Sequence, residues 1–196
     1  MALAGITRHN SFMNQSIWNQ NYLHPVKWDQ QFAPLALHDM FFQSAERMGR
    51  AAMADFMGRK YSYAEMAATV RRVARGLQDK GIGKGDQIGL FLPNVPQYIA
   101  AYYGALAAGA TVVNFSPLYT VDELAHQVAD SGTSILFTVS AAALLPTAMK
   151  VLDNSSLKEL IVGSVSEALP KAKGWAYRLF KRNEIAKIPS DSRVST

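Results

Sequence analysis

From Leu37 onward, apolar residues recur at helical spacing and then give way to short apolar runs. One helical face collects residues three or four positions apart, namely Leu37, Phe41, Ala45 and Met48. Gly49 is placed to end this helix. Residues 52–56 and 60–63 follow as two short strand-like runs with Gly58 between them. The pattern predicts a helix and then a short hairpin.

Strands and helices alternate after the hairpin. The expected strands are compact apolar runs, at residues 87–92, 110–115, 134–139 and 159–162. The helices between them begin near Ser62, Pro96 and Thr120, and both Ser62 and Thr120 precede a glutamate by three positions, as in a capping box. A further helix is expected over residues 141–152, broken or restarted at Pro146. This alternation predicts an α/β fold with a mostly parallel sheet and helices on both faces.

The chain divides into three predicted parts. Residues 1–36 are rich in Asn and Gln, carry Pro25 and Pro34, and are expected to form an irregular N-terminal arm. This arm either lies over the domain or pairs with a second copy of the chain in a homodimer. Residues 37–165 form the expected α/β subdomain, and residues 166–196 form a basic amphipathic segment and a truncated end.

The net positive charge of the chain comes from one segment. The net charge is +5, and residues 171–187 hold six cations against one acid, so the remainder of the chain is neutral. Nucleic acid is therefore not expected as a partner, since no further positive surface remains for a duplex. The chain has no cysteine, which excludes disulfides and thiolate chemistry and favours the cytoplasm.

The basic segment has the pattern of an amphipathic helix. On a helical wheel its apolar residues gather on one side and its cations on another, and the candidate membrane-surface residues are Trp175, Arg178, Leu179, Lys181 and Arg182. One interpretation places this helix in the interface of an anionic membrane, giving a protein peripheral to the inner membrane. The other interpretation is a solvated helix that docks on its own protein.

The sequence offers few candidates for chemistry. The glycines of residues 81–85 close a helix and precede a strand, the reverse of a phosphate-binding loop, and are read as a turn. The four histidines lie far apart and lack metal-ligand spacing. Residues 114–120 join a strand's carboxyl end to a helix and form either a rigid joint or a lining on the substrate side.

Three ordered segments carry a resemblance to a known family. They are residues 61–65 (YSYAE), residues 81–94 (GIGKGDQIGLFLPN), and residues 113–120 (VNFSPLYT) followed by Glu123-Leu124 and Asp130-Ser131-Gly132. Their order and spacing resemble the AMP-forming acyl-CoA synthetases, specifically the N-terminal part of bacterial long-chain fatty-acid–CoA ligases. Another adenylate-forming ligase, acting on aryl or amino acids, and a non-catalytic docking module stay open as alternatives.

The resemblance implies a two-step reaction for the full-length parent. A fatty carboxylate attacks the α-phosphate of ATP with Mg²⁺ assistance, giving an acyl-adenylate and pyrophosphate, and the CoA thiol then displaces AMP. The family binds phosphate with a Ser/Thr/Gly-rich loop, and the chain is expected to stop just ahead of it. No catalytic, cofactor-binding or metal residue is therefore assigned, no cofactor is expected on this chain alone, and the chain is expected to be inactive by itself.

Overall fold

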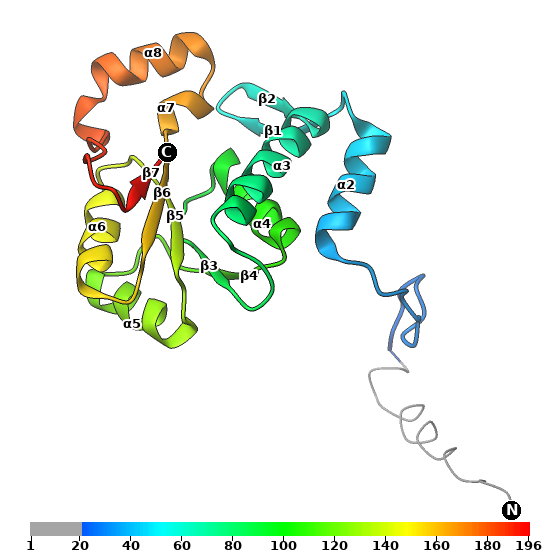
Figure 1. Cartoon of the computed structure of the whole chain (residues 1–196). Helices are drawn as coiled ribbons and strands as arrows, with labels where there is room; N and C mark the ends of the chain where they lie inside the picture. Colours follow the sequence, from blue (N-terminus) through cyan, green and yellow to red (C-terminus); the bar gives the residue numbers. More distant parts are fainter. Residues whose placement is uncertain (1–20) are drawn as a thin grey trace, which may run out of the picture. The chain divides into compact units, whose positions relative to one another are not determined.

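The structure is a computed structural model that describes residues 21–196, and the chain falls into two units, Met1–Leu35 and Ala36–Thr196 (Figure 1). Within the first unit, residues 21–35 form turns and bends without a helix or strand. The rings of Tyr22 and Trp28 meet edge to face there, with 5.2 Å between centroids. The arm expected over residues 1–36 stays a prediction, because its first 20 residues lie outside the described part.

The second unit begins with a helix and a hairpin. Helix α2 (Leu37–Met48) ends at Gly49, and strands β1 (Ala52–Phe56) and β2 (Arg59–Ser62) pair antiparallel. Met57 and Gly58 connect them with φ angles of 54° and 95°. Two positive φ angles match the twist that a two-residue hairpin turn requires. The predicted hairpin is present, with its second strand one residue earlier than expected.

A five-stranded parallel sheet forms the centre of this unit. Its order is β4 (Thr111–Asn114), β3 (Gln87–Leu90), β5 (Ile135–Val139), β6 (Glu159–Gly163) and β7 (Val194–Ser195). One transverse row of this sheet runs through Leu90, Phe137, Ile161 and Ser195, which are register partners on adjacent strands. Side chains of such a row point to the same face.

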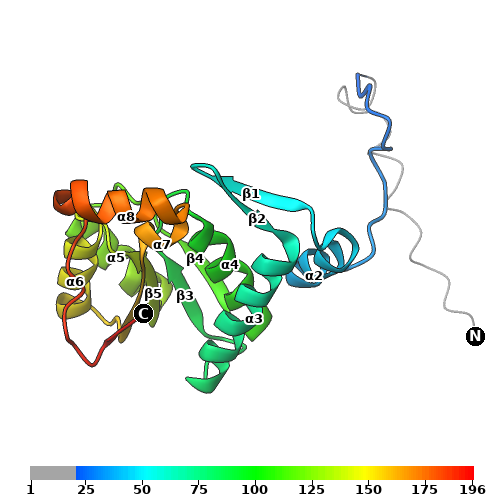
Figure 2. The ribbon, with the colours of Figure 1, turned by 90° about the horizontal axis from the view of Figure 1, so that it is seen from above.

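Helices cover both faces of the sheet. Figure 2 shows α3 (Tyr63–Asp79) and α4 (Pro96–Ala108) on one side and α5 (Val121–Ser131) and α6 (Leu145–Asn154) on the other. Strands with both faces covered are buried, and β5 is buried at all of its positions. The predicted α/β class with a parallel sheet and helices on both faces is confirmed.

Local sequence signals define several helix ends. Ser62 with Glu65, and Thr120 with Glu123, form complete capping boxes at the starts of α3 and α5. In each box the glutamate pKa is lowered, chiefly by the hydrogen bond from the backbone of the capping residue. Gly132 ends α5 in the left-handed conformation.

The C-terminal third departs from the predicted boundaries. Residues 141–144 form a turn and α6 starts only at Leu145, because Pro146 is tolerated in the first turn of a helix but not within it. After α7 (Val165–Ala168), helix α8 (Lys171–Phe180) ends at Lys181, so the amphipathic helix is shorter than residues 171–187. The chain then forms a short 3₁₀ turn, η2 (Arg182–Glu184), and a bridge between Ala141 and Ile185. Strand β7 was not predicted.

No helix among residues 21–196 has the length and apolar content needed to cross a membrane.

Candidate functional site

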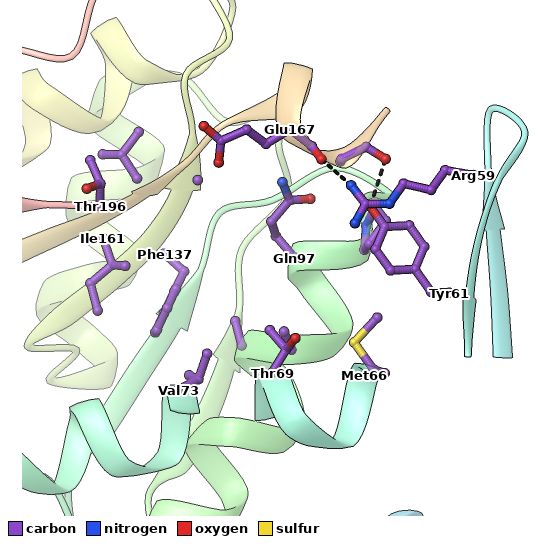
Figure 3. A pocket seen from close by; sticks show the side chains of 16 residues that line it. Arg59, Tyr61, Met66, Thr69, Val73, Gln97, Phe137, Ile161, Glu167 and Thr196 are labelled. Atoms are coloured by element: carbon purple, nitrogen blue, oxygen red, sulfur yellow. Dashed lines mark hydrogen bonds between the residues drawn. The ribbon is translucent and has the colours of Figure 1, made fainter. Parts of the chain in front are cut away.

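A mostly apolar groove lies between α3 and the sheet (Figure 3). It consists of two adjoining cavities of about 270 and 370 Å³, and Figure 3 shows the lining of the first. Both cavities are lined by Thr69, Val73, Phe137, Ile161 and Thr196. Thr69 and Val73 are four residues apart on α3, and Phe137 and Ile161 are neighbours across β5 and β6. The groove is therefore the part of this sheet face that α3 and α4 leave partly uncovered.

Polar groups gather at one end of the groove. The Tyr61 hydroxyl donates a hydrogen bond to the Ala168 carbonyl at 2.7 Å, and the Arg59 guanidinium donates to the Glu167 carbonyl (Figure 3). The guanidinium also lies 4.5 Å from the centroid of the Tyr61 ring, a cation–π distance. These contacts tie the hairpin to α7 and close this end of the groove.

Gln97 contributes a hydrogen-bond acceptor. Its Nε2 donates to the Ser164 carbonyl at 2.9 Å, whereas its Oε1 is buried and accepts no hydrogen bond from the described residues. A buried acceptor left unpaired costs about 1–3 kcal/mol. A donor that reaches Oε1 from within the groove is therefore favoured.

Tyr61 is a hydrogen-bond donor at this end of the groove. Burial is the main cause that raises the pKa of Tyr61; the charge of Arg59 lowers this pKa and the charge of Glu65 raises it. The hydroxyl therefore stays protonated and acts as a donor. Within residues 21–196, no three His, Cys, Asp or Glu side chains gather as a metal site would require. Apolar walls with a few polar groups at one end are the chemistry of a binding surface.

The loop at residues 114–120 lies outside this groove. The Tyr98 hydroxyl donates to Asn114 Oδ1 at 2.8 Å, and Thr120 caps α5. Between them Leu118 is 88% exposed. The geometry is that of a fixed joint between β4 and α5, and a role on the substrate side stays a prediction.

The five predicted membrane-surface residues all lie on α8 or just after it. Trp175 and Leu179 are exposed, and Arg182 is exposed in η2. Arg178 instead faces its own protein, donating from Nε to Ser166 Oγ at 2.8 Å, and Lys181 pairs with Glu184. None of the five lines the groove.

The groove residues were not predicted as a site. Phe137 and Ile161 belong to apolar runs that were read only as buried strands. An apolar strand gives no local sign of whether a helix covers all of its face, so the sequence held no direct signal for this groove.

Comparison with known proteins agrees with the fold and the motifs. The profile of the AMP-binding enzyme family matches residues 41–192. A long-chain-fatty-acid–CoA ligase of Bacillus subtilis is 30% identical over 88% of this chain and 30% of its own length. One from Escherichia coli is 39% identical over 71% of this chain and 25% of its own length.

Among solved structures, a long-chain-fatty-acid-CoA ligase of Archaeoglobus fulgidus superposes with a TM-score of 0.61 at 24% identity. The superposition covers 71% of this chain and 30% of that one and supports the fold alone. The chain thus spans 25–30% of the length of these three proteins. With the profile matching most of its residues, the chain belongs to the AMP-binding enzyme family.

Proposed function

We propose that this chain forms the N-terminal α/β part of a long-chain fatty-acid–CoA ligase. The observation that carries the proposal is that relatives so named are 30% and 39% identical over 88% and 71% of this chain. The parallel sheet with helices on both faces agrees with it, although a fold of this kind serves many activities.

In the complete enzyme, a fatty carboxylate attacks the α-phosphate of ATP and displaces pyrophosphate, and the CoA thiol then takes the acyl group from the acyl-adenylate and releases AMP. ATP and Mg²⁺ supply the activation, and fatty acid and CoA are the other partners. Charge builds up on phosphorus in the first step and must be neutralised by cations and backbone donors.

This chain is proposed to contribute scaffold and binding surface, and to be inactive alone. Its sequence has no Ser/Thr/Gly-rich loop that leads to a lysine. The described groove provides apolar contacts from α3, β5 and β6. Its charged lining residues are Arg59, Arg72, Lys80 and Glu167, and Arg59 is tied to the backbone of α7. These features support the proposal that this chain contributes scaffold and binding surface, and no catalytic group, to the reaction.

We also place the enzyme in the cytoplasm, peripheral to the inner membrane. The cysteine-free composition supports the compartment. The cluster of cations around α8 supports attachment to an anionic surface.

A chimera tests the proposal. The matching 140-residue segment of the Escherichia coli ligase is replaced with that of this chain, and palmitoyl-CoA formation is measured. The chimera is expected to ligate palmitate in preference to 4-coumarate. A matched chimera carrying Gly104→Trp should lose ligation, because Gly104 packs directly against Val73 and α4 could no longer lie against α3. A folded, monodisperse chimera that fails to ligate palmitate contradicts the proposal.

A further inference from the structure

Helix α8 presents its apolar face to solvent and its polar side to the protein. The inward side includes Gly174, which is buried against the backbone of Ser166, and Arg178, which bonds Ser166 Oγ. Trp175 and Leu179 lie about 100° and 140° around the helix from Gly174, at about 100° per residue, and both are exposed. An amphipathic helix that packs on its own domain normally turns its apolar stripe inward. Here the orientation is reversed.

The outward side is large and apolar. Trp175 is 68% exposed, Phe180 is 77% exposed and Leu179 is 40% exposed. Met57, at the tip of the hairpin, is 63% exposed and is held beside α8 because Lys173 Nζ donates to its carbonyl at 2.7 Å. Figure 1 shows the hairpin turn reaching toward the α7–α8 segment.

Free cations border this apolar side. Lys171 is exposed at the start of the helix and Arg182 in η2 after its end, and within residues 21–196 neither forms an ion pair. Lys173 bonds only a carbonyl and keeps its charge available. Lys187 is a further exposed cation beyond η2. Apolar and aromatic side chains bordered by lysine and arginine are typical of helices that lie in a membrane interface.

We propose that α8 is a lipid-docking helix, with Trp175, Leu179, Phe180 and Met57 inserted at the acyl boundary and Lys171, Lys173 and Arg182 on anionic headgroups. The exposed cations define the occupant, because they complement an anionic lipid surface. This revises the predicted residue set: Arg178 binds Ser166 and Lys181 pairs with Glu184, and Lys171 and Lys173 take their place at the headgroups. The inference deepens the peripheral membrane location proposed above and rests on it, and it is independent of the ligase reaction.

Vesicle sedimentation of the full chain is the test. The vesicles contain phosphatidylcholine alone or with about 30% phosphatidylglycerol, the anionic component that attracts cationic segments. The chain should pellet with the anionic vesicles, and added salt should release it because salt screens exposed charges. Equal pelleting with both vesicles, or none with either, overturns the proposal; a protein partner for α8 would give the latter result.

Two variants separate the contributions. Trp175→Ala with Phe180→Ala removes the insertion, and Lys171→Glu with Arg182→Glu reverses the headgroup contacts. Each pair should weaken partition by about tenfold or more. The control for the charge reversal is Lys84→Glu with Lys158→Glu, at two exposed lysines away from α8. The control for the loss of exposed apolar side chains is Leu118→Ala. Both controls should bind vesicles as the parent does. Melting curves by circular dichroism verify that every variant folds.

A fluorescence readout reports insertion directly. The chain has three tryptophans, so Trp18→Phe with Trp28→Phe leaves Trp175 as the sole emitter. Its emission should shift to the blue with anionic vesicles and be quenched by brominated acyl chains. An unshifted, unquenched emission from pelleted protein overturns the insertion. Neither assay uses ATP or fatty acid, so their failure leaves the ligase proposal standing, and failure of the chimera leaves lipid docking standing.

Discussion

Gly174 lies directly against Ser166: a Cβ built on Gly174 would overlap the Ser166 carbonyl oxygen. The same serine accepts a hydrogen bond from Arg178 Nε at 2.8 Å through its hydroxyl. These two contacts from one side of α8 explain how the helix docks on α7 while its tryptophan stays exposed.

Gly174→Ala should detach α8 from α7. Alanine favours an isolated helix over glycine by about 1 kcal/mol, but overlap with backbone that cannot move aside costs about 1–3 kcal/mol. The cost of the overlap should therefore exceed the gain in helix propensity and detach the helix. Trypsin should then cut at Lys173 and Arg178 faster than in the parent. The matched control is Gly76→Ala on α3, where an added Cβ meets nothing within 4 Å. That variant should be more stable by about 0.5–1 kcal/mol; unchanged proteolysis in Gly174→Ala would contradict the docking account.

Gly104→Ala should weaken the contact between α3 and α4. A Cβ on Gly104 would stand 2.5 Å from Val73 Cγ1, so the helices must separate, at about 1–3 kcal/mol in the free energy of unfolding. Val73→Ala removes the opposing methyl groups. In a double-mutant cycle by urea unfolding, Gly104→Ala should cost less in the Val73→Ala background than in the parent. Additive costs would show that the two residues do not share this contact.

Asp191 should make the C-terminal turn sensitive to acid. Its carboxylate accepts hydrogen bonds from the side chain and backbone of Arg193, which lower its pKa from 3.8 to about 2. Because the folded pKa is the lower one, the stabilisation is present above about pH 4 and is lost as the pH falls toward 2. Hydrogen exchange of the Val194 and Ser195 amides, measured from pH 7 to pH 2.5 and corrected for intrinsic rates, should become faster as the pH falls below about 4.

Asp191→Asn should accelerate that exchange, after correction for intrinsic rates, at pH 7, and the acceleration should be smaller near pH 2.5, where part of the Asp191 stabilisation is already lost. Asp130→Asn on α5 controls for the loss of one negative charge. A constant difference between parent and Asp191→Asn across the range would contradict the assigned cause.

Short-range signals made most of the fold predictable. The capping boxes of Ser62 and Thr120 act within one helical turn, so four residues of sequence suffice to place the starts of α3 and α5. The start of α6 was misjudged because Ala141, Ala142 and Ala143 favour a helix, whereas the backbone there turns to bridge Ala141 with Ile185. That contact is distant in sequence and overrides propensity.

Long-range packing accounts for what the sequence did not predict. Strand β7 has two residues, and only its parallel pairing with Leu160 and Ile161 makes it a strand. The wheel placed Trp175 and Leu179 on one side of α8, yet which side faces solvent depends on the approach of Gly174 to Ser166. The groove likewise depends on where α3 lies over Phe137 and Ile161.

Pyrophosphate exchange into ATP, driven by palmitate, tests the central claim most directly. The isolated chain and the Escherichia coli chimera are compared in the same assay with Mg²⁺ present. The account predicts exchange by the chimera and none above background by the isolated chain. Adenylation requires cations and backbone donors that bind the phosphates of ATP and stabilise the charge that develops on them. Palmitate-dependent exchange by the isolated chain, at a rate near that of an intact ligase, would contradict it.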